Sequence, residues 1–148
     1  MDNTNIQGLD RFILAQERDF ERALTEISYG RKQTHWMWYI FPQIQGLGFS
    51  DSAKYYAVKD LKEAAAYVAH PVLGPRLLTI ARELLKHKGT SAQQIFGSPD
   101  DLKLRSSMTL FAALPNADPI FMEIINQFFQ GEIDQKTERI LNLQAYGK

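Results

Sequence analysis

The chain has 148 residues, 17 basic side chains against 17 acidic ones, three histidines and no cysteine. This length suits one ordinary domain that buries a core without disulfides or structural metals. The charge balance argues against binding to duplex nucleic acid or an anionic membrane, and the absence of thiols excludes cysteine nucleophiles, thiolate metal sites and redox switching.

The sequence contains no pattern of a targeting or membrane segment. Residues 1–10 lack a charged stretch followed by an apolar one, and no stretch approaches the roughly 20 apolar residues of a membrane span. We therefore expect a soluble, cytoplasmic protein.

Apolar residues recur at helical spacing in the first part of the chain. Their stripe predicts a helix over residues 10–29 that Gly30 ends, with a break near residues 17–19 as an alternative. Thr34 is then expected to cap one or two turns through the tryptophans. These turns must end by Phe41, because the residue before a proline is disfavoured in a helix.

The later segments repeat this pattern, each opened by a capping residue or a proline. After a loop at 43–49, the predicted helices are 50–58 with Ser50 as cap, 59–70, 71–89 from Pro71, 91–97, 99–114 with Ser98 and Pro99, 119–130 with Asp118 and Pro119, and a terminal helix from Asp134. Residues 37–41 could form a strand by composition but have no partner strand. The sequence therefore predicts one all-α domain of about seven to nine short helices, with its core at about residues 8–143.

One run of residues, 30–43, concentrates cations, a histidine and large aromatic side chains. At a helix N-terminus, cations, hydroxyls and free N–H groups can hold a phosphate or carboxylate; the residues expected to do so are Arg31, Lys32, Thr34 and His35. A base or nicotinamide ring that stacks on an indole or phenol gains about 1 to 3 kcal/mol; the residues expected to provide this surface are Trp36, Trp38 and Tyr39. Alternatively, Thr34 is only a cap, the cations are solvated and the aromatic residues are core.

Two further groups of residues are candidates for the same site. Lys103 shares a helix face with Ser106 and Ser107, whose hydroxyls either allow close helix packing or bind a ligand. After the glycine-containing loop, the side chains expected to reach the site are Ser50, Ser52, Tyr55 and Tyr56. His70 and His87 are expected to be structural, and no spacing of ligands predicts a metal site.

The chain resembles the family called domain of unknown function 1810. The matching stretches are RFILAQ, GRKQTHWMWYIFPQ, GLGFSDSAKYYA, HPVLGPRL, IFGSPDDLKLRSSMTLF and FFQGEIDQKT. This resemblance implies a compact all-helical fold and no established activity. Some members are labelled calpastatin, a label we discount because the inhibitory regions of calpastatin are disordered and this chain is a packed globule.

A more distant resemblance is to the helical family associated with NAD and ADP-ribose, which includes N-glycosidases acting on ribosyl compounds. Tyr55 and Tyr56 follow the stretch SDSAK much as an aromatic pair follows an essential glutamate in that family, but Ala53 stands at the glutamate position. The resemblance implies a nucleotide or ADP-ribose derivative as ligand.

From these features we expect a protein that binds a phosphorylated nucleoside-like molecule, such as an NAD or ADP-ribose derivative. Cleavage of an N-glycosidic bond would be its active form, with His35 or Asp51 assisting departure of the base. The alternative is a noncatalytic module for protein–protein interaction or self-association. No cofactor is predicted, and the oligomeric state stays open.

Overall fold

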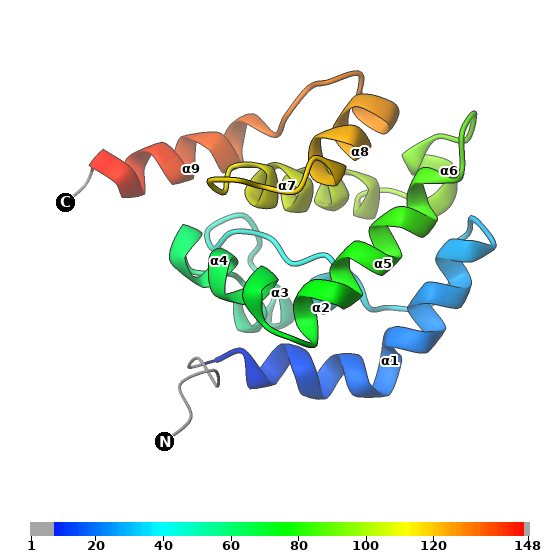
Figure 1. The fold of residues 1–148 in the computed structure, drawn as a ribbon, viewed down its shortest axis with the longest axis horizontal. Coiled ribbons are helices and arrows are strands. Elements are labelled where there is room, and N and C mark those ends of the chain that lie inside the picture. The colour runs from blue at the N-terminus through cyan, green and yellow to red at the C-terminus, as the bar shows by residue number, and fades with distance from the viewer. Residues whose placement is uncertain (1–7, 147–148) are drawn as a thin grey trace.

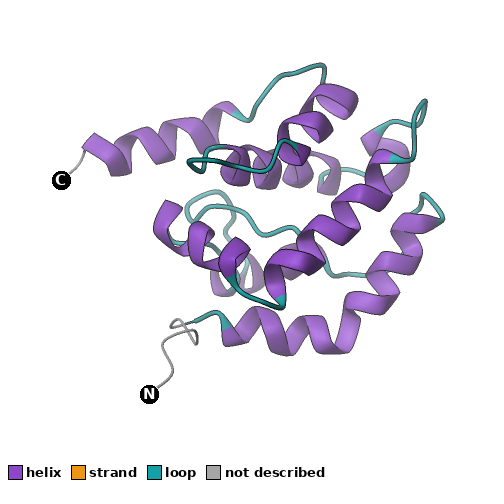
Figure 2. Cartoon of the chain, viewed as in Figure 1, coloured by secondary structure: helices purple, strands orange, loops and turns teal. Residues whose placement is uncertain are grey.

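The structure, a computed structural model, describes residues 8–146, and these form helices without a β-strand (Figures 1 and 2). The helices are α1 (Asp10–Ser28), α2 (Met37–Ile40), α3 (Asp51–Tyr55), α4 (Leu61–Ala69), α5 (Leu73–Leu85), α6 (Ala92–Phe96), α7 (Asp100–Ala112), α8 (Ile120–Phe129) and α9 (Gln135–Tyr146). Across the described residues, strand-like pairing is limited to an isolated parallel bridge between Ile44 and Val58. The predicted all-α class is confirmed.

Two groups of helices enclose the core. α7, α8 and α9 lie together on one side, α1 to α4 lie on the other, and α5 runs obliquely between the groups (Figure 1). α5 contacts α1, α4 and α8, whereas α7 contacts α4, α6, α8 and α9. Within residues 8–146, no helix is both long enough and apolar enough to cross a bilayer.

α1 is one continuous helix, so the alternative break at residues 17–19 is wrong. The polar side chains on its inner face have partners in the core. Gln16 donates to the carbonyl of Tyr39 at 2.7 Å and to the hydroxyl of Tyr67 at 2.8 Å, and Asp19 accepts from the hydroxyl of Tyr39. A buried polar group costs little when it is hydrogen-bonded, so these residues do not interrupt the helix.

Two predicted helix starts are confirmed in detail. The Ser50 hydroxyl accepts a hydrogen bond from the backbone N–H of Ala53, 3.1 Å away, and caps α3. The Asp134 carboxylate accepts from the N–H of Thr137 at 3.1 Å and precedes α9. Each bond satisfies an N–H that the helix itself leaves unpaired.

Three other predicted starts differ from the structure. The residue that precedes α2 is Trp36, without a side-chain cap, and Thr34 is bonded elsewhere. α5 begins at Leu73 instead of Pro71, and the ring nitrogen Nδ1 of His70 accepts from the N–H of Val72 at 3.0 Å just before it. α7 begins after Pro99, and the Ser98 side chain does not cap it.

Arg11 ties the end of α3 to α1. Its Nε donates to the carbonyl of Tyr55 and its Nη2 to the carbonyl of Ala57, each at 2.7 Å. The same guanidinium lies 3.4 Å from the carboxylate of Glu63 in α4. These contacts fix the position of α3 and of the chain that follows it.

Candidate functional site

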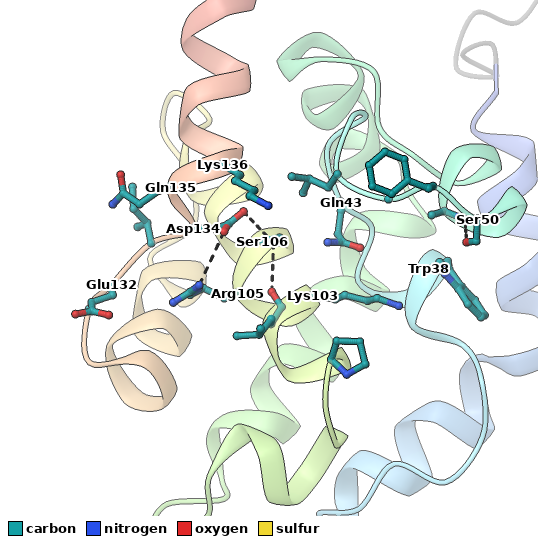
Figure 3. A pocket seen from close by; sticks show the side chains of 18 residues that line it. Trp38, Gln43, Ser50, Lys103, Arg105, Ser106, Glu132, Asp134, Gln135 and Lys136 are labelled. Atoms are coloured by element: carbon teal, nitrogen blue, oxygen red, sulfur yellow. Dashed lines mark hydrogen bonds and ion pairs between the residues drawn. The ribbon is translucent and has the colours of Figure 1, made fainter.

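A cleft of about 1090 Å³ opens between α2 and the segment 43–53 on one side and α7 with the α8–α9 connection on the other (Figure 3). Its lining residues are Trp38, Gln43, Leu47, Gly48, Phe49, Ser50, Ala53, Pro99, Leu102, Lys103, Arg105, Ser106, Gly131, Glu132, Ile133, Asp134, Gln135 and Lys136. The cleft therefore joins parts of the chain that are far apart in the sequence.

Four of the residues predicted from the sequence come together in this cleft: Trp38, Ser50, Lys103 and Ser106. Within the run from Trp36 to Phe41, Trp38 is the residue that is not buried. The Lys103 Nζ lies 5.4 Å from the centroid of the Trp38 ring and 3.3 Å from Asp100 Oδ1. Figure 3 shows Lys103 extending from α7 towards Trp38.

Lys32 lies outside the cleft lining and is buried beside the core. Its Nζ is 2.9 Å from Asp100 Oδ2 and 5.1 Å from the ring centroid of Trp36, and its side chain is 6% exposed. Its backbone N–H also donates to the carbonyl of Ile95 in α6. Lys32 thus holds α7 and the segment before α2 together.

Thr34 and Trp36 bind the carboxylate of Glu26, a residue that the sequence analysis did not select. Glu26 accepts from the Thr34 hydroxyl at 2.7 Å, the Thr34 N–H at 3.1 Å, the Gln33 N–H at 2.7 Å and the Trp36 indole at 2.9 Å. Burial raises the pKa of Glu26, but these hydrogen bonds outweigh it and lower the pKa to about 2. These hydrogen bonds to one carboxylate hold the α1–α2 connection in place.

Tyr39 and Tyr56 belong to the core beside the cleft. Burial and the neighbouring Asp19 carboxylate raise the pKa of Tyr39 to about 12, against the opposing effect of Arg18. The Tyr56 ring packs 5.0 Å from that of Tyr39 and 6.0 Å from that of Phe12, measured between centroids. These contacts agree with the alternative interpretation, in which Tyr39 and Tyr56 pack in the core and do not bind a ligand.

The remaining predicted residues lie outside the lining of the cleft. Arg31, His35, Asp51 and Tyr55 are exposed, and Ser52 is partly exposed. None of residues 31–35 lines the cleft, so the expectation that Arg31, Lys32, Thr34 and His35 bind an anion beside the stacking surface is corrected. The cations in the lining of the cleft come instead from α7 and the start of α9.

Ser106 and Ser107 have different surroundings although they are adjacent. Ser106 donates to Asp134 Oδ2 at 3.0 Å at the edge of the cleft. Ser107 is fully buried, and its hydroxyl has no hydrogen-bond partner among the described residues. The packing alternative fits Ser107, whose small side chain lets α7 approach its neighbours closely.

Four charged residues of the cleft lining were not selected from the sequence as site residues: Arg105, Glu132, Asp134 and Lys136. Arg105 Nη2 lies 3.9 Å from Asp134 Oδ1. Asp134 Oδ2 also accepts from the Thr137 hydroxyl at 2.5 Å, so one carboxylate caps α9 and orients Arg105 and Ser106. The charged stretch GEIDQKT was the available signal, and its acidic residue was interpreted only as a cap.

The chemistry available in this cleft is recognition of an anion and of a planar ring. Lys103, Arg105 and Lys136 provide positive charge, and Trp38 provides a partly exposed aromatic surface. Over residues 8–146, histidine, aspartate and glutamate side chains form no group of three or more able to hold a metal ion.

The fold and the cleft define a small all-helical domain with an open cleft of mixed aromatic and cationic lining. The chain belongs to the family described as "Protein of unknown function (DUF1810)", which matches residues 6–141. The crystal structure of the conserved hypothetical protein Rv1873 from Mycobacterium tuberculosis is similar, with 42% sequence identity and a TM-score of 0.89. The match covers 90% of this chain and 96% of that one. No curated protein matches the chain. The more distant resemblance to the family associated with NAD and ADP-ribose stays a prediction.

Proposed function

We propose that the cleft binds a small phosphorylated molecule that carries an aromatic ring, as a phosphorylated nucleoside does. The observation that carries this proposal is the presence of Trp38, Lys103, Arg105 and Lys136 in one open cavity. Stacking of a base on an aromatic side chain contributes about 1 to 3 kcal/mol. Charge-assisted hydrogen bonds from lysine and arginine provide strong and oriented contacts to phosphate oxygens.

The size of the cleft suits this class of ligand. Small-molecule sites usually measure about 300 to 1,000 Å³, and the cleft measures about 1090 Å³. It has room for a nucleoside with its phosphate groups, including an NAD or ADP-ribose derivative. Because it is open along one side, part of a larger ligand would stay in solvent.

Cleavage of an N-glycosidic bond, the active form expected from the sequence, has less support than binding. Neither His35 nor Asp51 lines the cleft. The carboxylates in the lining are Glu132 and Asp134, and Asp134 is already bonded to Ser106 and Thr137. Incubation with NAD and chromatography of the products would test this form directly, with release of nicotinamide as the positive result.

Calorimetric titration with NAD, ADP-ribose and nucleoside monophosphates tests the proposed binding. We expect heat of binding with at least one of these compounds for the wild-type protein, and loss of that heat in Trp38→Ala. Tyr29→Ala is the matched control, because Tyr29 is an exposed aromatic residue outside the cleft lining. An absence of binding by all of them at millimolar concentration would overturn the proposal.

A second function, protein–protein interaction or self-association, is favoured by two exposed apolar side chains in the cleft lining. Phe49 is 86% exposed and Leu102 is 48% exposed. Light scattering after size-exclusion chromatography tests self-association. This function predicts a dimer that Trp38→Ala or Phe49→Ser dissociates, whereas a monomer at all concentrations argues against self-association.

A further inference from the structure

The ammonium group of Lys103 lies over the ring of Trp38 in the protein without ligand. The distance from Nζ to the ring centroid is 5.4 Å, within the range of a cation–π contact. Figure 3 shows the lysine side chain reaching across from α7 to this indole. A planar ligand that stacks on the same face of Trp38 must first displace this ammonium group.

Lys103 is free to move because another lysine also neutralises its acidic partner. Asp100 has Lys32 Nζ at 2.9 Å from Oδ2 and Lys103 Nζ at 3.3 Å from Oδ1. The Lys32 side chain is 6% exposed and the Lys103 side chain 28%. When Lys103 leaves, Asp100 keeps its contact with the buried lysine and is not left as an unpaired charge.

The two lysines near Trp38 share one carboxylate, that of Asp100. Farther along α7, Arg105 Nη2 has a carboxylate of its own at 3.9 Å, Asp134 Oδ1. Among Lys32, Lys103 and Asp100 the positive charges outnumber the negative ones by one. A positive charge that an anionic ligand can pair with is therefore present beside the aromatic surface.

We propose that Lys103 makes the cleft selective for aromatic molecules that carry one anionic group, over neutral aromatic molecules. This inference rests on the proposed function. A neutral ring that stacks on Trp38 removes the cation–π contact and gives the ammonium no new partner. A ring with a phosphate or carboxylate group within reach of the lysine supplies that partner, so the displaced cation is paired again.

The experiment compares adenosine 5′-monophosphate with adenosine by titration of tryptophan fluorescence and by calorimetry. We expect the wild-type protein to bind the monophosphate at least tenfold more tightly than the nucleoside. In Lys103→Met this ratio falls below about threefold, and the affinity for adenosine stays the same or rises because the ring no longer competes with a cation. Nicotinate against nicotinamide is the second pair, and it distinguishes a carboxylate from a phosphate as the preferred anion.

Lys88→Met is the matched control, since it removes an exposed lysine outside the cleft lining and is expected to preserve the tenfold ratio. Circular dichroism melting checks that each variant is folded. If the wild-type protein binds the charged and neutral members of both pairs equally, the selectivity is overturned while binding in the cleft stands. The same conclusion follows if Lys103→Met weakens both members of a pair by the same factor. No binding of any of the four compounds overturns the inference together with the proposed function.

Discussion

The indole Nε1 of Trp36 donates a 2.9 Å hydrogen bond to the carboxylate of Glu26, and both side chains are buried. The same carboxylate accepts from the N–H groups of Gln33 and Thr34. The connection between α1 and α2 is thereby fixed at one point. The short helix α2 follows directly, and it places Trp38 at the cleft.

Replacement of Glu26 is expected to destabilise the protein strongly. In Glu26→Gln the side-chain NH₂ group faces N–H and O–H donors, and at least one buried donor loses its acceptor. We expect a decrease of about 2 to 4 kcal/mol in the free energy of unfolding, because unpaired buried donors bear the full desolvation cost. Urea denaturation measures it. Glu21→Gln is the control, since Glu21 is exposed on the same helix, and a similar loss in both variants would contradict the assigned role.

The stability of the wild-type protein is expected to fall in acid partly through this residue. Hydrogen bonds outweigh burial and lower the pKa of Glu26 to about 2 in the folded protein, from 4.5 in the unfolded chain. Between these two values the unfolded chain binds the proton more tightly, so the contribution present above pH 4.5 is lost as the pH falls towards 2. Unfolding free energies at several acidic pH values should fall less steeply in Glu26→Gln. Equal slopes would show that other carboxylates account for the acid dependence.

The two tryptophans are expected to respond differently to truncation. Trp36 is 1% exposed, and Trp36→Ala should cost about 3 to 5 kcal/mol of stability. Trp38→Ala should cost only about 1 to 2 kcal/mol, because part of its ring is in water already, while it removes ligand binding. Denaturation curves combined with calorimetry separate these effects. Equal losses of stability would mean that both rings contribute equally to the core, and would contradict the role of Trp38 as a partly exposed surface of the cleft.

Gly74 is expected to be intolerant of any side chain, although alanine usually stabilises a helix relative to glycine by about 0.5 to 1 kcal/mol. A Cβ atom at Gly74 would lie 2.1 Å from the carbonyl oxygen of Val68, where α4 meets α5. We therefore expect Gly74→Ala to cost about 2 to 3 kcal/mol. Thermal denaturation tests this, and an unchanged or higher melting temperature would show that the two helices can separate without cost.

Local signals in the sequence were enough to predict the helices and several of their ends. Ser50 and Asp134 act as expected because a cap needs only the N–H groups of the next few residues. The prediction that Thr34 caps α2 was wrong, because its hydroxyl donates to the carboxylate of Glu26 on α1. Whether a distant side chain takes the hydroxyl that would otherwise cap a helix depends on the tertiary fold. Residue type and local spacing do not reveal such a contact.

The residue types of the candidate site could be predicted from the sequence, but only some of the residues that share the cleft could. Trp38 and Lys103 have the aromatic and cationic character that the proposed ligand needs, and both lie in the cleft. Residue types alone could not distinguish Trp38 from Trp36, since the direction of each indole is set by the first turn of a four-residue helix. Lys136 was missed because the fold, and not the sequence order, brings the start of α9 into the cleft that Trp38 lines.

The shared carboxylate of Asp100 has a consequence for attempts to redesign the protein. This one acidic side chain pairs with the buried ammonium group of Lys32 and with the more exposed ammonium group of Lys103, which lies over Trp38 in the cleft. In a library of random variants sorted first for solubility, position 100 should accept few substitutions, whereas position 103 should accept many. Altered ligand preference is therefore best sought at position 103, where a change of charge does not put the fold at risk.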